Sequence, residues 1–375
     1  MGNLLILGDS EIHDILISLS RTEIYTFRDA ILQCLTDFSV GAERKHQPQP
    51  GVVNRPEGQR CLFRPFTSAS SVGAKIVVQP AASSKAAGAL HGMIAICDAD
   101  GLPSGILNAE EVTGYRTSLS ALIPWVTWRK HTENIVVFGA GKQALWHLRL
   151  ALALRGEEIK SIVVINRTVS RAEALIAKVK EENETRWKSD TVMQCVDPSR
   201  DDYQGVLKGH LAIADAVFCT AGAKAPLFPA RYVTEGRNRQ PYISAIGSWQ
   251  PDMIELDPEL LRHLGAHRPQ QPSGGEQSSS KLRGALLVDD RETVVPHTGE
   301  LLQSKLGAEH IYELGEIADQ LPHCSADDKE ILQEWLSEGL LVYKSIGVGM
   351  TDLAASNAIL EFARKRGLGT TISQF

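Results

Sequence analysis

A glycine turn between an apolar strand and a helix is the part of this sequence best suited to chemistry. The run Asn134–Phe138 predicts a buried parallel strand, and apolar residues recur at helical spacing over 145–154. Between them stand Gly139, Gly141 and Ala144, in the order of the dinucleotide-binding fingerprint. The first glycine allows a tight turn, the second lets the backbone approach a pyrophosphate, and the small third residue lets the helix lie close to the strand. The N-terminus of that helix would hold the phosphates.

The end of the next predicted strand, 161–165, indicates which nucleotide is bound. Asn166, Arg167 and Thr168 follow this strand, where the adenine ribose would lie. An acidic residue there would accept a hydrogen bond from the 2′-hydroxyl of NAD, and the sequence has none. Arg167 can instead pair with a 2′-phosphate, which favours NADP(H) over NAD(H). The alternative is a structural βαβ unit with an ordinary surface arginine.

A lysine in an apolar strand is the second candidate for chemistry. Lys75 stands near the start of the predicted strand 73–78. Burying its amine is costly unless the amine meets a partner or a substrate. The alternative is a lysine whose stem is buried while its amine reaches the surface.

Composition limits the class of protein. The chain has 375 residues, enough for two domains, with 43% hydrophobic and 22% charged residues, as in ordinary globular proteins. A formal net charge of −6 and the lack of a basic cluster argue against nucleic acid as a partner. Six scattered cysteines indicate reduced thiols in a cytoplasmic protein, and none of their spacings predicts a metal site. No secretory signal and no membrane-spanning run are expected.

The elements that must position these residues fall into two groups. The first 120 residues are rich in predicted strands, and the following two hundred alternate strand and helix, which predicts a parallel doubly wound sheet. Strands are expected at 3–7, 52–53, 61–63, 73–78, 92–97, 104–107, 134–138, 161–165, 192–196, 216–219, 242–246 and 285–288. Helices are expected at 11–20 (capped by Asp9 or Ser10), 25–40, 109–120, 145–154, 170–182, 258–264, 313–319, 327–338 and 353–366. A loop is expected over 266–282.

The order of several motifs resembles the ornithine cyclodeaminase/μ-crystallin family over nearly the whole chain. These motifs occupy residues 73–75, 98–103, 108–117, 139–144, 166–168, 245–252 and 345–352. The resemblance implies a homodimer with an α/β fold, in which a doubly wound Rossmann-type sheet is inserted into a strand-rich α+β domain. Residues 1–120 plus 345–375 would form the substrate-binding and dimerisation domain, and 121–344 the NAD(P)-binding domain.

The resemblance also implies roles for single residues. Lys75 and Arg116 would be the catalytic residues, with Lys75 donating a proton to an imine nitrogen or a carbonyl and Arg116 meeting the substrate carboxylate beside the cofactor. A buried lysine can have a lowered pKa that suits this task. For Arg116 the alternative is an ion pair on a helix surface. The cofactor contacts that the resemblance implies are Arg116, Thr117, Gly139, Gly141, Lys142, Gln143, Ala144, Asn166, Arg167, Thr168, Thr220, Ala221, Gly247 and Ser345.

Two departures from the family pattern affect the expected reaction. Trp249 stands where true cyclodeaminases carry an aspartate, and Asp252 follows a proline at a position to which that role does not transfer. The family's carboxylate-binding arginine near residue 50 is missing, and Arg64, or else Arg55, is the candidate to replace it, with an exposed Arg64 as the alternative. The first hypothesis is therefore an NADP(H)-dependent reductase of a small imino or keto acid, or the reverse amino-acid dehydrogenase. An ammonia lyase of the cyclodeaminase type and a non-catalytic, NADPH-dependent binder of small ligands are the alternatives.

Overall fold

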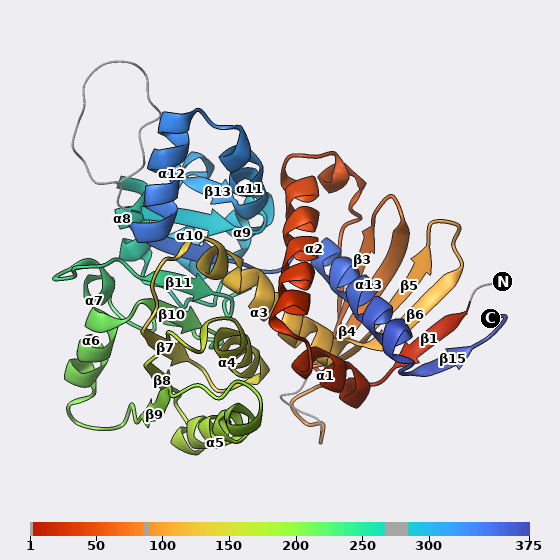
Figure 1. The fold of residues 1–375 in the computed structure, drawn as a ribbon, viewed down its shortest axis with the longest axis horizontal. Helices are drawn as coiled ribbons and strands as arrows, with labels where there is room; N and C mark the ends of the chain where they lie inside the picture. Colours follow the sequence, from red (N-terminus) through yellow and green to blue (C-terminus); the bar gives the residue numbers. More distant parts are fainter. Residues whose placement is uncertain (1–2, 86–89, 267–283) are drawn as a thin grey trace. The chain divides into compact units, whose positions relative to one another are not determined.

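The chain forms two compact units in a computed structural model that describes residues 3–85, 90–266 and 284–375 (Figure 1). Unit 1 comprises residues 1–120 and 347–375, and unit 2 comprises residues 121–346. Unit 1 is built from both ends of the chain. The mixed α/β fold class expected from the sequence is confirmed.

Unit 1 contains a seven-stranded sheet in the order β15-β1-β6-β5-β4-β3-β2. Strands β1 and β6 pair in parallel, and the remaining neighbours are antiparallel. The strands are β1 (Leu4–Leu7), β2 (Gly51–Asn54), β3 (Arg60–Thr67), β4 (Ser71–Gln79), β5 (His91–Asp98), β6 (Pro103–Asn108) and β15 (Thr370–Ile372).

Alternation of residue type gives this sheet two different faces. Arg64, Lys75 and Ile94 are directly paired across β3, β4 and β5, so their side chains lie on one face. This inner face also carries buried Phe66 and Ile96, and the helix α13 (Gly349–Arg366) contacts β3, β4 and β5. Lys75 is therefore placed under a helix and not towards solvent.

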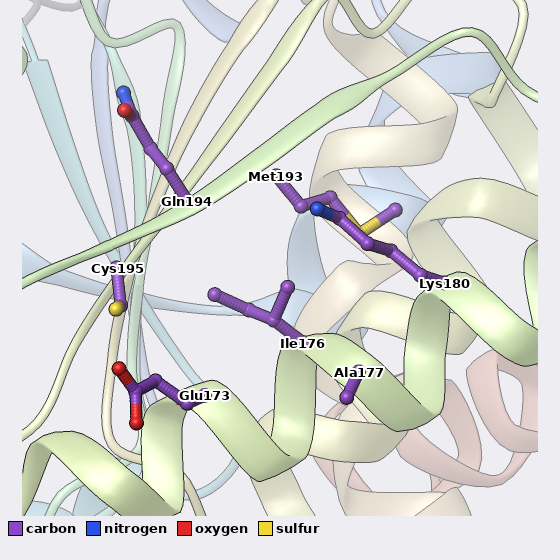
Figure 2. A pocket seen from close by; sticks show the side chains of 7 residues that line it. All are labelled: Glu173, Ile176, Ala177, Lys180, Met193, Gln194 and Cys195. Atoms are coloured by element: carbon purple, nitrogen blue, oxygen red, sulfur yellow. The ribbon is translucent and has the colours of Figure 1, made fainter.

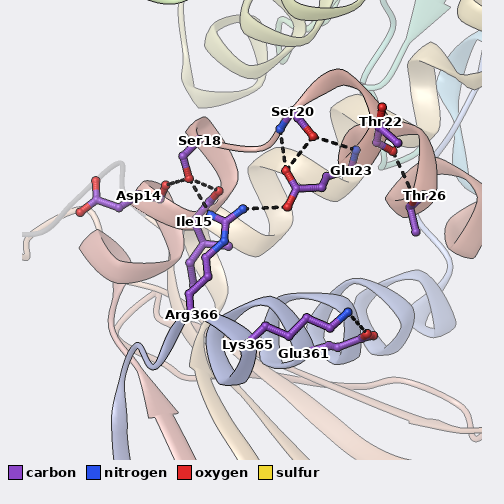
Figure 3. A network of polar contacts seen from close by, with 10 residues as sticks. All are labelled: Asp14, Ile15, Ser18, Ser20, Thr22, Glu23, Thr26, Glu361, Lys365 and Arg366. Carbon is purple, nitrogen blue, oxygen red and sulfur yellow. Dashed lines mark hydrogen bonds and ion pairs between the residues drawn. The ribbon is translucent and has the colours of Figure 1, made fainter.

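The helices of unit 1 are joined by charge and hydrogen bonds as well as by packing. They are α1 (Asp9–Ile17), α2 (Arg21–Ser39), the 3₁₀ turn Glu43–His46, the start of α3 (Ala109–Trp128) and α13. Arg366 of α13 donates to the Ser18 hydroxyl at 2.8 Å and to the Glu23 carboxylate of α2 at 3.0 Å, as the dashed lines in Figure 3 mark. Ser20 and Glu23 form a capping box at the start of α2.

The first helix begins earlier than the sequence predicted. Its N-cap is Gly8, whose backbone N–H donates to the Glu11 carboxylate at 2.8 Å, so Asp9 and Ser10 lie inside the helix and the predicted cap is wrong. Glu11 thus satisfies the backbone N–H of the N-cap residue itself, as the N3 glutamate of a capping box does.

Unit 2 contains an eight-stranded, fully parallel sheet in the order β13-β12-β14-β11-β10-β7-β8-β9. The strands are β7 (Asn134–Phe138), β8 (Ser161–Ile165), β9 (Val192–Val196), β10 (Ala216–Cys219), β11 (Tyr242–Ala245), β12 (Gly284–Val288), β13 (Ile311–Glu313) and β14 (Leu340–Lys344). The chain runs outward from β7 to β9 and then returns to place β10 on the other side of β7. The point between β7 and β10 is the topological switch point, where doubly wound sheets bind their ligands.

Helices connect the strands of unit 2, and one buried cluster joins the sheet to α6 and α8 through residues such as Leu211, Val217, Ile243 and Leu260. The helices are α4 (Lys142–Arg155), α5 (Val169–Thr185), α6 (Tyr203–Ile213), α7 (Arg231–Thr234), α8 (Pro258–Ala266), α9 (Arg291–His297), α10 (Gly299–Ser304), the 3₁₀ turn Ala308–His310, α11 (Leu314–His323) and α12 (Ala326–Glu338). No helix of the described ranges combines the length and the apolar character needed to cross a bilayer.

Two strands of this sheet, β13 and β14, were not predicted. All five residues of β14 are buried, and its apolar run directly follows α12, so periodicity could not separate it from the helix. The loop predicted over 266–282 lies, apart from residue 266, outside the described residues.

Candidate functional site

Lys75 is buried and ion-paired in unit 1. Only 3% of the residue is exposed, and its Nζ lies 3.1 Å and 3.2 Å from the two carboxylate oxygens of Asp352. Asp352 stands in the first turn of α13 and is fully buried. The lysine therefore does not reach the surface, and its amine has the partner that burial requires.

Arg116 binds the same carboxylate from a third element. Arg116 lies on α3, and its Nε donates to Asp352 at 2.8 Å. Only 3% of the residue is exposed, so the alternative of an ion pair on a helix surface does not apply. Gly347 lies against the guanidinium with φ +92°, and a Cβ there would stand 3.0 Å from one of its nitrogens. Only glycine fits both this conformation and this contact. Three segments thus meet at one buried carboxylate.

Arg64 lies beside this group and Arg55 does not. Arg64 is the direct cross-strand partner of Lys75 and is half-buried, on the same face of the sheet. Arg55 is exposed in the turn between β2 and β3. Of the two arginines weighed from the sequence, Arg64 is the one placed near Lys75, and its role in binding a carboxylate stays a prediction.

The charges around Lys75 set its protonation. Burial lowers the pKa of Lys75 to about 8; the Asp352 carboxylate opposes this shift, while Arg116 and Arg64 add to it. Burial would raise the pKa of Asp352, but the combined pull of Arg116, Lys75 and Arg64 holds it below its ordinary value. Cys34 of α2 also faces this charge cluster, and burial raises its pKa to about 12, so the thiol stays neutral. At neutral pH the group has more positive than negative charge and suits an anionic ligand.

The glycine turn of unit 2 has the backbone geometry of a phosphate-binding turn. Gly139 has φ +113°, and a Cβ on it would stand 2.6 Å from the Thr220 hydroxyl, which itself donates to the Phe138 carbonyl at 2.8 Å. A Cβ on Gly141 would meet nothing within 4 Å. Ala144, the third residue of α4, is fully buried. The residues present therefore fit a dinucleotide, with an open approach at the second glycine and the N-terminus of the 14-residue helix α4 behind it. Lys142 and Gln143 are the first two residues of that helix.

The end of β8 places Arg167 at the surface. The Asn166 side chain donates to the Thr168 carbonyl at 2.8 Å and closes the turn into α5. Arg167 and Thr168 are exposed, so the guanidinium is accessible to a phosphate. Thr117, on α3 in unit 1, is half-buried.

Three of the other residues expected to contact the cofactor each donate a hydrogen bond to an acidic side chain of unit 2. The backbone N–H groups of Ala221 and Gly247 donate to the buried Glu255 carboxylate at 3.0 Å and 2.6 Å, and the Ser345 hydroxyl donates to Asp289 at 2.6 Å. These groups hold the ends of strands in place, so any direct contact with a nucleotide must come from other atoms of these residues.

Two positions weighed from the sequence lie in the segment after β11. Trp249 is half-buried there, while Asp252 pairs with Lys224 at 2.8 Å and has 59% of its side chain exposed. An exposed ion pair of this kind is not expected to act as a catalytic base. The position of Asp252 is therefore consistent with the prediction that it does not take the role of the cyclodeaminase aspartate.

Sequence reasoning missed the acidic partners. Asp352 was included in a motif but given no role, and Glu255, Glu300 and Lys344 were not singled out. An acidic residue in the first turn of a helix that follows a glycine-rich segment was the available local signal for Asp352, and that pattern does not reveal burial between two cations. Across residues 3–85, 90–266 and 284–375, no cluster of three His, Cys, Asp or Glu side chains suits a metal ion.

A surface hollow of about 320 Å³ lies in unit 2 between α5 and the edge strand β9 (Figure 2). It is lined by Glu173, Ile176, Ala177, Lys180, Met193, Gln194 and Cys195. The hollow is lined by α5 and edge-strand side chains and not by the carboxyl ends of the strands at the switch point, where doubly wound sheets bind ligands.

Comparison with known proteins identifies one matching family model and several relatives of this chain. The family model described as shikimate / quinate 5-dehydrogenase matches residues 126–246, which lie in unit 2 and include the glycine turn. An uncharacterized cyclodeaminase of Dictyostelium discoideum is 27% identical over 279 residues, 73% of this chain and 70% of the relative. A Δ1-pyrroline-2-carboxylate reductase of Colwellia psychrerythraea is 25% identical over 262 residues (70% and 69%), and the ketimine reductase μ-crystallin of Mus musculus is 24% identical over 259 residues (68% and 64%).

Solved structures share the fold. The Δ1-pyrroline-2-carboxylate reductase of Thermococcus litoralis, solved with NADH and L-proline, has a TM-score of 0.71 at 17% identity and covers 98% of this chain and 100% of its own. An archaeal alanine dehydrogenase dimer with bound NAD has a TM-score of 0.70 at 17% identity, with 100% of both chains covered.

The fold is that of a class of protein with a Rossmann-type nucleotide domain, in which several relatives and neighbours are named as reductases or dehydrogenases. Within it, the chain is related to the ornithine cyclodeaminase/μ-crystallin family, and the resemblance drawn from the motifs is confirmed. Two of the three relatives are named as a Δ1-pyrroline-2-carboxylate reductase and a ketimine reductase, which is the class of enzyme that the motifs predicted, and that prediction of class is confirmed.

Proposed function

We propose that the chain is an NADP(H)-dependent reductase of a small imino or keto acid, or the corresponding amino-acid dehydrogenase in the reverse direction. One observation carries the proposal: a buried lysine with a pKa of about 8 shares a carboxylate with a buried arginine, in a chain whose other unit has a dinucleotide-binding turn. The reductases among the relatives named above support an imine as the substrate.

The residues of unit 1 supply the acid and the anion site of this reaction. When bound, the dihydronicotinamide supplies a hydride to the carbon of the C=N bond. Lys75 then gives a proton from Nζ to the imine nitrogen, which takes the electron pair of the former π bond, so that one hydride and one proton convert the imine to an amine. Arg116 and Arg64 bind the substrate carboxylate, since a guanidinium suits bidentate pairing with a carboxylate.

Asp352 would keep Lys75 and Arg116 in place for this reaction. Because the carboxylate contacts both cations at 2.8–3.2 Å, it fixes where the amine and the guanidinium lie and opposes the loss of the lysine proton. Asp352 is in this scheme a positioning residue and does not itself need to contact the substrate.

The nucleotide would be held by the glycine turn, by the first residues of α4 and by Arg167. The exposed Arg167 guanidinium at the end of β8 and the absence of an acidic residue in 166–168 support a 2′-phosphate, and therefore NADP(H). Six cysteines without a disulfide support a reducing compartment such as the cytoplasm.

A homodimer is part of the proposal, formed through the outer face of the sheet of unit 1. Phe63, Ile76 and Met93 are directly paired on this face, and Val72 lies on the same side. Phe63, Val72 and Met93 are 42%, 41% and 39% exposed, so a flat apolar surface is left on a monomer. Such a surface suits a second copy of the chain, and the archaeal alanine dehydrogenase neighbour is described as a dimer.

The test of the function is a cofactor-oxidation assay. Purified protein is mixed with NADPH and a cyclic imino acid such as Δ1-pyrroline-2-carboxylate, and absorbance at the dihydronicotinamide band is followed. We expect oxidation that depends on both reagents and is lost in Lys75→Met. Failure to oxidise NADPH or NADH with any of a panel of imino and keto acids would refute the proposal.

A further inference from the structure

A second buried charge cluster lies in unit 2, at the carboxyl ends of β11 and β14. Lys344, the last residue of β14, and the carboxylates of Glu255 and Glu300 are all fully buried. Lys344 Nζ lies 3.4 Å from Glu300 and 3.9 Å from Glu255. The mechanism proposed above uses none of these three side chains.

The cluster is bonded to backbone that follows two strands. Glu255 accepts hydrogen bonds from the N–H groups of Ala221, after β10, and of Gly247 and Ser248, after β11, at 3.0, 2.6 and 3.0 Å. Lys344 donates to the carbonyl of Ser248 at 2.6 Å and to that of Ala245 at 3.2 Å. The Glu255 carboxylate thus binds backbone N–H groups of the segment after β11, and the Lys344 amine binds carbonyl groups at the end of β11 and in that segment.

Packing leaves this loop no room to relax. A Cβ on Gly247 would stand 2.4 Å from the Glu255 carboxylate and 2.5 Å from the Ala221 carbonyl. The Ser248 hydroxyl donates to Glu300 at 2.5 Å. The loops after β10 and β11 are therefore locked to each other through one carboxylate.

The position and cost of the cluster argue for a role beyond stability. Burying ion pairs is usually no more stabilising than well-packed apolar side chains of similar volume. Burial raises the pKa of Glu255 to about 8, which shows how strongly its site is desolvated. The cluster lies where strands β10 and β11 end, next to the switch point at which doubly wound sheets bind nucleotides.

We propose that Lys344, Glu255 and Glu300 form a clamp that fixes the loops after β10 and β11 in the conformation that binds the nicotinamide nucleotide. The proposal rests on the proposed function for the identity of that ligand. The three side chains are positioning residues: they act through the backbone of 221 and 245–248.

The test combines loop dynamics with cofactor affinity. In the full chain, Lys344→Met removes the donor to both carbonyls, and Glu255→Gln replaces one accepting oxygen with an NH₂ group that cannot accept. We expect each variant to raise amide hydrogen exchange over 246–249 at least tenfold and to weaken NADPH binding, measured by fluorescence titration, at least tenfold. Arg149→Met is the matched control, since it breaks the ion pair of buried Arg149 on α4 with Glu182 on α5, two helices outside the loops after β10 and β11; it should leave both readouts within twofold.

The outcomes separate the clamp from the proposed function. Exchange over 246–249 that is unchanged in both variants, or loosened loops with unchanged NADPH affinity, would overturn the clamp. If the wild type binds neither NADPH nor NADH, the proposed function fails, and hydrogen exchange alone then supports or overturns the clamp. Should Lys344→Met not fold, Ser248→Ala removes only the bond to Glu300 and should raise exchange about threefold; no change in it would count against the clamp.

Discussion

Replacing Asp352 with asparagine is expected to lower the pKa of the Lys75 amine and to move the pH dependence of the reaction with it. The substitution keeps the shape of the side chain but removes the carboxylate that pairs with the Lys75 amine. Arg116 and Arg64 remain, and both disfavour a charged lysine. The amine would then face two cations and no anion.

The distances set the size of the effect. Two unit charges 3.1 Å apart interact by about 5 kcal/mol at an effective dielectric constant of about 20. Reorientation of the amide and entry of water will recover part of this energy, so we take one pKa unit, about 1.4 kcal/mol, as the smallest shift. Loss of the buried partner should also cost about 3–5 kcal/mol of folding stability.

The sign of the pH effect follows from the role of Lys75 as proton donor. Only the charged amine can donate, so imine reduction should decline as the pH rises through the pKa of Lys75, about 8 in the wild type. In Asp352→Asn the same decline should begin at least one pH unit lower. The reverse oxidation needs the neutral amine and should show the opposite trend.

Two measurements check this prediction. The first is the pH profile of kcat/KM, which reports groups of the free enzyme. The second is an NMR titration of protein labelled with ¹³Cε-lysine, with Lys75→Met to assign the resonance, which needs no turnover. Asp252→Asn is the matched control because that carboxylate forms an exposed pair with Lys224; it should leave the titration unchanged. A Lys75 titration with the same midpoint in the wild type and in Asp352→Asn would refute the reasoning.

Three further predictions concern the other parts of the proposal. Lys75→Met should lower kcat at least a hundredfold while leaving the NADPH Kd from fluorescence titration within about threefold, since loss of a general acid costs about 10²–10⁴ in rate; equal losses in both would contradict its role as acid. Arg167→Ala should raise the KM for NADPH at least tenfold and leave that for NADH unchanged, whereas Arg171→Ala, at an exposed arginine in the first turn of the following helix α5, should change neither. Phe63→Asp together with Met93→Asp should convert the proposed dimer to a monomer in analytical ultracentrifugation, and a variant that stays dimeric would exclude the outer sheet face as the interface.

Local sequence patterns were sufficient for much of the fold. The strand, glycine turn and helix from Asn134 to Arg155 could be predicted because each step depends on residue types close together in the chain. The same holds for the strands expected at 52–53 and 61–63 and for the alternation of strands and helices in unit 2. The strand β14 was missed because a short apolar run after a helix carries no periodicity of its own.

The site was predicted less completely because its contacts are long-range. Lys75 and Arg116 could be proposed from motifs, but Asp352 meets Lys75 across 277 positions of sequence. Nothing local to Asp352 shows that it is buried between two cations. Glu255 and Lys344 are similar cases, since a charged residue in a short loop or at a strand end is normally exposed, and only the packed structure shows that these two are not.

The most direct test of the central claim is a single-turnover reaction of wild-type protein with NADPH and Δ1-pyrroline-2-carboxylate, followed by analysis of the product. We expect one equivalent of NADPH to be oxidised for each equivalent of the cyclic amino acid formed, and no reaction in Lys75→Met with NADPH still bound. Oxidation that proceeds equally well in Lys75→Met, or none with any imino or keto acid in the wild type, would contradict the claim that this buried lysine is the proton donor of an imine reductase.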